Sequence, residues 1–445
     1  MQELSISRPS SHFYALINYE DPYVQPLILS ALERLLPKHL PPNSYTLISS
    51  LDDLPSPTSP LLVIGAYECL PFDHIIDHRT TLCNAYVIRK ALIRKHYLST
   101  TAFNWTTKNP SSILATNVRP SCDFELDYAE FLNDALVEAW ELQESFRRNK
   151  DKEVEQREWW ILKPGMSDRG QGIRLFSTEE ELQGIFEEWE AERPESDDEG
   201  DEKEGERDSK EATQGGREEV KHGGDYIVTS HLRHFIAQPY IHPPLLVPSN
   251  PHKFHIRTYV LAFGSLKVYV YKPMLALFSA TPYTPPWAFS SNTSTSQDLS
   301  AHLTNTCLQS GIHEGSVQEF WNLDLSQDLK QKVWKQICET TGEIFEAAAK
   351  GMMVHFQTMP NSFEVFGLDF LVDEGGTAWL LEVNAFPDFR QTGDELKGLV
   401  GGLWEEVVGT VVEEFFGVEV NWEGTEKEEG ADGLVLVRSA ELGKK

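Results

Sequence analysis

The stretch FEVFGLDFLVDEGGTAWLLEVNAFPDF, from Phe363 to Phe389, decides the fold of this chain. Apolar and polar residues alternate through two short runs separated by a turn rich in Glu and Gly, a pattern typical of an antiparallel hairpin. If Glu374 to Thr377 form the loop, Asp373 faces Ala378, and this register then holds along both strands. The sequence therefore predicts two paired strands joined by a short loop.

This register brings three oxygen-bearing side chains to one face of the hairpin. It places Asp369 opposite Glu382, and Asn384 shares that face because it lies two residues further along. Two carboxylates and a carboxamide suit Mg²⁺, which is usually held by one or two carboxylates together with nucleotide phosphates. A solvated strand face is the alternative interpretation. The opposite, core-facing set comprises Leu368, Phe370, Leu381 and Val383.

Composition narrows the class of protein. With 445 residues, 40% of them hydrophobic, the chain can bury a large core in two or three packed units. A net charge of −30 opposes binding to nucleic acid. No long apolar run or leader-like start is visible, so we predict no membrane association and a reducing cytoplasmic location, with the nucleus as the alternative. Five scattered cysteines without a CxxC pair are predicted to be reduced structural thiols: Cys69, Cys83, Cys122, Cys307 and Cys338.

Changes in composition suggest the domain organisation. HFYALINY and LLVIG, near the N-terminus, are typical of buried parallel strands and predict a small α/β domain. Residues 187–222 are rich in acids, Pro, Gly and Ser, and we expect a disordered, solubilising insertion there. The predicted divisions are an N-terminal domain over 1–78, a central part over 79–241, a C-terminal part over 242–420, and a tail over 421–445 without assigned function.

A basic segment follows the N-terminal strands. TTLCNAYVIRKALIRKH, from Thr80 to His96, has the spacing of an amphipathic helix in an otherwise acidic protein. Its outer face would be a landing site for an acidic peptide, with an ordinary solvated helix face as the alternative. The basic residues assigned to that face are Arg89, Lys90, Arg94 and Lys95.

Two further hairpins carry candidate phosphate ligands. WWILKPGMSDRGQGIRLF, residues 159–176, predicts a strand, a glycine-rich turn and a second strand, with Lys163 and Arg169 near the turn. Its spacing excludes a Walker P-loop. HKFHIRTYVLAFGSLKVYVYK, residues 252–272, predicts a long hairpin on which Lys253, His255 and Arg257 share one face. That face suits a triphosphate, although three exposed residues on an edge strand are the alternative.

Taken in order, these motifs resemble the tubulin–tyrosine ligase family within the ATP-grasp superfamily. The matching pieces span roughly residues 80 to 400 and include WWILKPGMSDRGQGI, FIAQPYIHPPLLV, KFHIRTYVL, AHLTNTCLQ and the Phe363 hairpin. The resemblance implies an α/β (α+β) ATP-grasp ligase in which two antiparallel sheets clamp ATP, preceded by the small N-terminal domain. It also implies ATP and Mg²⁺ as cofactors and a cytoplasmic α-tubulin tail or similar acidic peptide as partner, alongside a free amino acid.

The resemblance also assigns roles to single residues. Lys163 and Arg169 would hold phosphates, while Gln238, Tyr240 and Ile241 would meet the adenine. Lys253 and Arg257 would reach phosphate or the activated carboxylate, and Asn305 would lie near the reacting groups. Asp369, Glu382 and Asn384 match the family's magnesium ligands, and Arg257, Asn305 and Glu382 would be the catalytic set.

The implied reaction is an amide synthesis through an acyl phosphate, because a bare carboxylate is a poor electrophile. We expect a tyrosine-like amino acid to be added to the peptide tail. Two departures affect this expectation. His255 replaces the family's usual Asp, and Leu277 lies near the position of a substrate-binding Arg in tyrosine-adding relatives. The alternatives are therefore a catalytically impaired ATP-binding scaffold, or a glutamate or glycine ligase of the same family.

Overall fold

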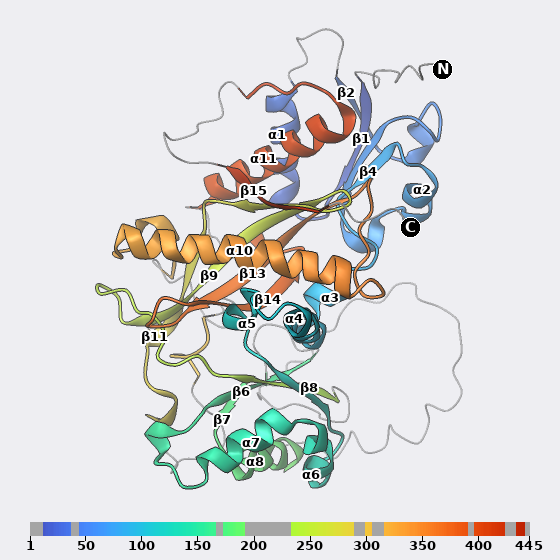
Figure 1. Cartoon of the computed structure of the whole chain (residues 1–445). Coiled ribbons are helices and arrows are strands. Elements are labelled where there is room, and N and C mark those ends of the chain that lie inside the picture. The colour runs from blue at the N-terminus through green and yellow to red at the C-terminus, as the bar shows by residue number, and fades with distance from the viewer. Residues whose placement is uncertain are drawn as a thin grey trace, which may run out of the picture. The chain divides into compact units, whose positions relative to one another are not determined.

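The computed structural model (Figure 1) divides into two compact units, and each is described by itself. Unit 1 comprises Met1–Arg119, Pro243–Tyr283 and Thr304–Lys445, and unit 2 comprises Pro120–His242 and Thr284–Leu303. The structure describes residues 12–36, 44–165, 172–191, 233–288, 299–304, 316–389, 396–422 and 433–440. The four predicted domain divisions remain a prediction.

A seven-stranded, antiparallel sheet forms the centre of unit 1. Its path runs β12-β11-β9-β10-β15, and β13 pairs with both β9 and β14. The strand β9 is central because its aromatic and β-branched side chains are buried along nearly its whole length. The strands are β9 (His252–Phe263), β10 (Lys267–Tyr271), β11 (Leu275–Pro282), β12 (Val317–Glu319), β13 (Phe363–Val372), β14 (Ala378–Ala385) and β15 (Leu434–Ser439).

Helices cover both faces of this sheet (Figure 1). On one face, the long helix α10 buries Val333, Ile337 and Phe345 against alternate residues of β9 and β13. On the other face, α11 buries a Val-rich stripe together with α1. Because successive side chains of a strand point to opposite faces of the sheet, the same strands contribute to two separate hydrophobic cores. The helices around the sheet are α1 (Val24–Leu35), α3 (Lys90–Ile93), α4 (Lys95–Lys108), α5 (Leu114–Asn117), α10 (Gln327–Gly351) and α11 (Lys397–Phe416).

Unit 1 also contains a parallel sheet of order β2-β1-β3-β4. Its strands β1 and β3 are the two apolar runs expected from the sequence, and they pair directly in parallel. One face packs on α1 and α11, and the other packs near α2. The elements are β1 (Phe13–Asn18), β2 (Tyr45–Ile48), β3 (Leu61–Gly65), α2 (Phe72–Asp77) and β4 (Thr81–Cys83).

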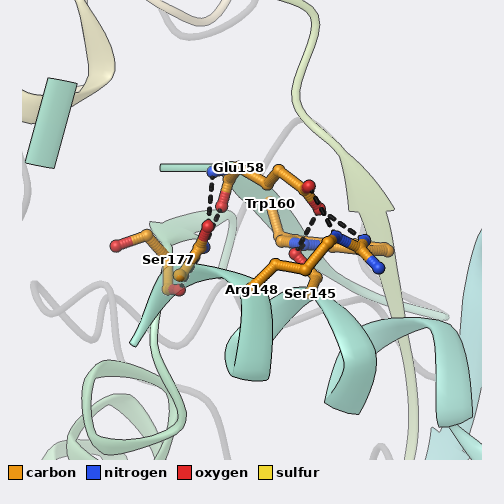
Figure 2. A network of polar contacts seen from close by, with 6 residues as sticks. Ser145, Arg148, Glu158, Trp160 and Ser177 are labelled. Carbon is orange, nitrogen blue, oxygen red and sulfur yellow. Dashed lines mark hydrogen bonds and ion pairs between the residues drawn. The ribbon is translucent and has the colours of Figure 1, made fainter. Parts of the chain in front are cut away.

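Unit 2 holds a second antiparallel sheet, of order β5-β8-β6-β7. Figure 2 shows how α7 is fastened to it: Glu158, next to β6, accepts hydrogen bonds from Arg148 at 2.7 and 2.8 Å and from Ser145 at 2.8 Å. Trp160 donates its indole N–H to Ser145 at 2.8 Å. The elements are β5 (Cys122–Glu125), α6 (Leu132–Ala135), α7 (Trp140–Asn149), β6 (Trp160–Pro164), β7 (Arg174–Phe176), α8 (Glu179–Ala191) and β8 (His234–Pro239).

The structure corrects two expectations. Residues 80–96 do not form one helix, since β4 pairs in the parallel sheet and only the short α3 and the start of α4 are helical. Neighbouring strands determine that local structure, which the helical spacing alone could not reveal. The helix α8 runs to Ala191, so the first five residues of the expected insertion are helical, and residues 192–222 lie outside the described part.

Two further expectations concern membranes and cysteines. Within the described residues, no helix is sufficiently long and apolar to span a membrane. Four of the cysteines, Cys69, Cys83, Cys122 and Cys338, are free thiols, as expected, and Cys307 lies outside the described residues.

A buried ion pair attaches the segment before α3 to the central sheet. Arg89 lies 2.9 Å from Glu364 of β13 through Nε, and its guanidinium lies 3.7 Å from the centre of the Tyr67 ring. The backbone N–H of Tyr86 donates to the same carboxylate at 3.1 Å. Burial raises the pKa of Glu364 to about 8, although Arg89 and the Tyr86 N–H oppose that rise. Arg89 and the Tyr86 N–H thus favour the ionised form of Glu364, but the desolvation penalty outweighs them.

This raised pKa makes the stability of the protein depend on pH. Unfolded glutamate titrates near about 4.3, so the native state retains a proton that the unfolded state releases as the pH rises above that value. We expect the free energy of unfolding of the native chain, relative to Glu364→Gln, to fall between about pH 5 and pH 8, by at most about 1.4 kcal/mol per pH unit. Urea denaturation followed by circular dichroism measures it. A difference that grows with pH would contradict the expectation, and the exposed Glu339→Gln provides the control.

Candidate functional site

The hairpin of β13 and β14 places Asp369 directly opposite Glu382, as the sequence predicts. The route to that pairing differs from the expected one. Next to the loop, Val372 rather than Asp373 pairs with Ala378, and a bulge between Asp369 and Phe370 then restores the expected register. A bulge inserts one extra residue and re-aims the side chains beyond it.

The bulge changes which residues of β14 reach the core. Leu381 is the extra residue and is only half-buried, contrary to the expectation that it points into the core. Leu380 occupies the core position instead, at 1% exposure and opposite Phe370. The alternation of apolar and polar residues alone could not locate this bulge, because the point at which a bulge breaks the two-residue repeat depends on the pairing with the neighbouring strand.

One face of β9 changes from apolar to polar along its length. Tyr259, Leu261 and Phe263 pack in the core shared with α1 and α11. The same alternating series continues through Arg257, His255 and Lys253, which are all at most 8% exposed. The polar half of the strand is therefore as deeply buried as the apolar half, and its charges need partners.

Arg257 finds its partner on the adjacent strand. Asp369 and Arg257 face each other in the register of β13 and β9. Arg257 donates from Nε to Oδ1 and from Nη2 to Oδ2, the second bond measuring 3.0 Å. This two-pronged geometry is the strong form of a carboxylate–guanidinium pair. Gly367 leaves room for it, since a Cβ there would lie 3.3 Å from the Arg257 Cδ and 2.9 Å from Pro387.

Asn384 and Lys95 complete the polar cluster. The Asn384 amide donates to Glu382 Oε1 at 3.1 Å and to Asp369 Oδ2 at 3.4 Å. The Lys95 ammonium, at the start of α4, lies 3.6 Å from Glu382 Oε2. Sequence analysis missed this contact and assigned Lys95 to a peptide-binding surface. No sequence signal predicts an ion pair between residues so far apart in the chain.

The two carboxylates crowd each other. Burial raises the pKa of Asp369 to about 6; Arg257 opposes the rise, and the neighbouring Glu382 adds to it. Such crowding of negative charge fits a divalent cation, which compensates both carboxylates at once. Among the described residues, no three His, Cys, Asp or Glu side chains gather to hold a metal ion. A divalent cation at this position would need further ligands, from Asn384 and from a bound molecule, to complete its coordination.

His255 lies in the same cluster as a neutral side chain. Burial, together with the charges of Arg257 and Lys253, lowers its pKa to about 3, although Glu382 opposes them. Its Nδ1 lies 2.6 Å from the hydroxyl of Thr304, and its Nε2 lies 3.6 Å from Asp369. No sequence pattern indicates the contact with Thr304. At neutral pH this position therefore adds hydrogen-bonding capacity and no charge.

Unit 2 holds the residues expected to meet a nucleotide base. Lys163 of β6 donates to Gln238 Oε1 of β8 at 3.0 Å, across two directly paired strands. Tyr240 packs beside Trp159 and Leu175, and its hydroxyl lies 2.7 Å from His302 Nδ1. Ile241 is buried, at 5% exposure. A charged ammonium group together with apolar and aromatic surfaces suits a nucleotide, which has charged phosphates and a flat base. The roles of these residues in nucleotide binding remain predictions.

Three further expectations have different outcomes. Arg169 and Asn305 lie outside the described residues. Arg89 is wrong as a member of an exposed basic face, because it is buried and paired with Glu364. Lys90 is exposed, and Arg94 is partly buried.

Comparison with known proteins identifies the family of this chain. A family model described as the tubulin-tyrosine ligase family matches residues 94–417. A probable tubulin–tyrosine ligase of Schizosaccharomyces pombe is 40% identical over 402 residues, covering 90% of this chain and 91% of that protein. Probable tubulin–tyrosine ligase PBY1 of Saccharomyces cerevisiae is 43% identical over 360 residues, covering 79% of this chain and 46% of that protein. This chain thus matches less than half the length of the second relative.

A solved structure extends the likeness to the fold. The crystal structure of the C-terminal domain from K. lactis Pby1 is described as that of an ATP-grasp enzyme interacting with the mRNA decapping enzyme Dcp2. It has a TM-score of 0.68 and 33% sequence identity, and it covers 97% of this chain and 99% of that chain. More distant relatives are named tubulin polyglutamylases. The expected mixed α/β ATP-grasp fold with two antiparallel sheets is confirmed.

The Arg257–Asp369 pair predicts a pattern of stabilities. Arg257→Ala leaves a buried carboxylate beside Glu382, and we expect a loss of about 3–5 kcal/mol in the free energy of unfolding. Arg257→Lys keeps the positive charge but loses the two-pronged hydrogen bonding. We expect its free energy of unfolding to lie between those of the native chain and Arg257→Ala. The double variant Arg257→Met/Asp369→Leu recovers most of the loss, because neither charge remains buried. Urea denaturation measures all four proteins. An alanine variant as stable as the native chain would contradict this account.

Proposed function

Because this chain belongs to the tubulin–tyrosine ligase family, we propose that it is an ATP-dependent ligase that joins an amino acid to a peptide carboxylate. The proposed acceptor is the C-terminal tail of α-tubulin or a similar acidic peptide, and the proposed donor is tyrosine or a similar free amino acid. The observation that carries the proposal is the buried cluster on one sheet face, where Asp369 and Glu382 gather beside Arg257.

The proposed roles in unit 1 follow from the charges. Asp369, Glu382 and the Asn384 oxygen would hold Mg²⁺, which supplies charge compensation for phosphate oxygens when it is bound. Lys253 and Arg257 are buried cations on the same face, and each would hold a phosphate oxygen or the activated carboxylate. Arg257 would also keep Asp369 ionised, because its fixed charge opposes the rise in pKa that burial causes.

The proposed roles in unit 2 concern the nucleotide. Lys163, positioned by its hydrogen bond to Gln238, would reach a phosphate together with Arg169. Tyr240 and Ile241 would contact the adenine, and Gln238 would hydrogen-bond it. Asn305 would lie near the reacting groups. These assignments rest on the family resemblance and on the local geometry of unit 2.

The proposed chemistry has two steps. An oxygen of the acceptor carboxylate attacks the γ-phosphorus of ATP, the bond to the β-phosphate oxygen breaks, and ADP leaves. The amine of the amino acid then attacks the acyl carbon, phosphate leaves with the bonding electrons, and the amine loses a proton as the amide forms. Lys253 and Arg257 would stabilise the negative charge that develops, and no enzyme nucleophile is required.

The acceptor tail would be met by the remaining basic residues before and within α4. Lys90 is exposed, whereas Arg94 and Lys95 are partly buried. Lys95 already lies near Glu382, so it would place a positive charge between the metal ligands and an approaching acidic tail. Arg89 has no part in this surface because it is committed to Glu364.

Two observations favour other donors or a loss of activity. His255 is neutral where an acid is usual in the family, and Leu277 is 2% exposed in the apolar core, where tyrosine-adding relatives are expected to carry an Arg. A glutamate or glycine ligase would need a different anchor for its amino acid, and several relatives are named polyglutamylases. A scaffold that binds ATP without ligation is the other candidate.

Nucleotide binding can be tested without knowledge of the acceptor. We expect Mg·ATP to raise the melting temperature of the native chain, because a ligand at about 100 times its Kd adds about 2.7 kcal/mol to the stability of the native state. Lys163→Met and Glu382→Gln reduce the shift, while Glu339→Gln, on the exposed side of α10, keeps it. No shift with millimolar Mg·ATP would refute both the ligase and the ATP-binding scaffold.

Amino-acid transfer separates the ligase from the scaffold. With ATP and a peptide of the α-tubulin tail, we expect labelled tyrosine to become bound to the peptide, measured by scintillation counting and mass spectrometry. Glu382→Gln lowers the rate at least about 100-fold, the order expected for loss of a group that acts on developing charge. Parallel reactions with phenylalanine, glutamate and glycine identify the donor. ATP binding without transfer of any amino acid would favour the scaffold.

A further inference from the structure

Unit 2 carries an unusual concentration of exposed apolar side chains. Tyr128 is 41% exposed, Phe131 49%, Val137 67% and Trp140 63%. We refer to these four residues and the exposed residues between them as the 128–140 surface. Elsewhere in the described sequence, the large exposed hydrophobic residues are separated along the chain, except for the neighbours Met353 and Val354. Tyr128 and Phe131 contact each other, with ring centres 6.2 Å apart. Single exposures are ordinary, whereas several exposed apolar side chains on neighbouring short helices favour a contact surface.

The 128–140 surface lies on well-packed short helices. Leu132, Leu136, Ala139 and Leu142 recur at helical spacing and are buried in the core of unit 2. That packing leaves the alternate face, with Phe131, Val137 and Trp140, pointing to solvent. The helices themselves are fixed, since α7 is tied to β6 by the Glu158 network in Figure 2, and Glu190 of α8 accepts a hydrogen bond from the backbone of Ala129. The exposure therefore belongs to a rigid element.

Negative charge surrounds the apolar side chains. The 27 residues from Pro120 to Phe146 contain eight acids and no Lys, Arg or His. Glu130, Asp134 and Glu138 alternate with the apolar residues and are exposed, and none forms an ion pair with a described residue. By contrast, Asp127 pairs with Arg233 at 3.1 Å. The surface thus combines aromatic anchor sites with three exposed carboxylates that have no ion-pair partner among the described residues, while Arg147, further along α7, pairs with Glu144.

This charge pattern decides between possible occupants. A second copy of a chain with net charge −30 would meet its own excess of acids there. Nucleic acid and anionic membranes are repelled for the same reason. Residues 192–232 of this chain, which follow α8, also carry an excess of acids. An acidic acceptor tail is repelled as well, so the surface serves a contact other than the proposed ligase reaction.

We propose that the 128–140 surface docks a short basic peptide segment of another protein. Large apolar side chains of that segment, such as Leu or Phe, pack on Val137, Trp140 and Phe131. Its Lys and Arg side chains face Glu130, Asp134 and Glu138. Tyr and Trp dominate binding energy at interfaces, and complementary charge selects the partner and accelerates association.

The test is a selection with a random-peptide phage library on the full chain in the absence of ATP. We expect enriched peptides that combine Lys or Arg with Leu, Phe or Trp. Synthetic copies of them are then titrated by fluorescence anisotropy. The double variant Val137→Ser/Trp140→Ser weakens their binding at least 10-fold, and so does the triple variant Glu130→Gln/Asp134→Asn/Glu138→Gln. Phe103→Ser, which alters a side chain of similar exposure on α4, leaves their affinity unchanged.

The outcomes are distinct. All substituted side chains are exposed, so circular dichroism and the melting temperature of the variants match those of the native chain. Enriched peptides that are acidic or neutral would overturn the proposal. Peptides that bind both surface variants as tightly as the native chain would overturn it too, and so would a selection without any enriched sequence. None of these results bears on ATP binding, which the thermal shift measures separately.

Discussion

The buried pair of Arg257 and Asp369 is the interaction on which the candidate site depends. It joins β9 to β13 at the point where one sheet face changes from apolar to polar, and both side chains are at most 10% exposed. A guanidinium that is always protonated opposes the rise in the pKa of Asp369, which burial and Glu382 otherwise impose. Without that fixed charge, two carboxylates could not remain ionised together in a buried cluster.

The same constraint explains the neighbours of the pair. His255 lies between Lys253 and Arg257, and burial together with these cations keeps it neutral. Its two ring nitrogens lie near Thr304 and Asp369, so the neutral ring fills the space between them and offers each a polar group. Lys95 adds a positive charge at the outer carboxylate, Glu382, which is more exposed than Asp369. Charge is therefore balanced inside the cluster by Arg257 and at its rim by Lys95.

Unit 2 uses polar groups differently. Its Glu158 network fastens a helix to a sheet edge and leaves the outer helical face exposed. Glu158 is paired with Arg148 where it holds the fold together, whereas Glu130, Asp134 and Glu138 near Trp140 form no ion pair with a described residue. A surface carboxylate without an ion-pair partner costs the folded state little stability, so such acids need no structural role.

The sequence by itself determined the strands and what they carry. Alternation in FEVFGLDF and LLEVNA identified the hairpin and the pairing of Asp369 with Glu382, and alternation in HKFHIRTY identified the polar face of β9, because a two-residue repeat is a local property. It failed for residues 80–96, where pairing with β3 overrides helical spacing, and for Leu381, where a bulge shifts the repeat. The contacts of Arg257 with Asp369, Arg89 with Glu364 and Lys95 with Glu382 were decided only by tertiary structure. They join residues more than a hundred positions apart, and no local pattern encodes which distant charge a buried side chain will meet.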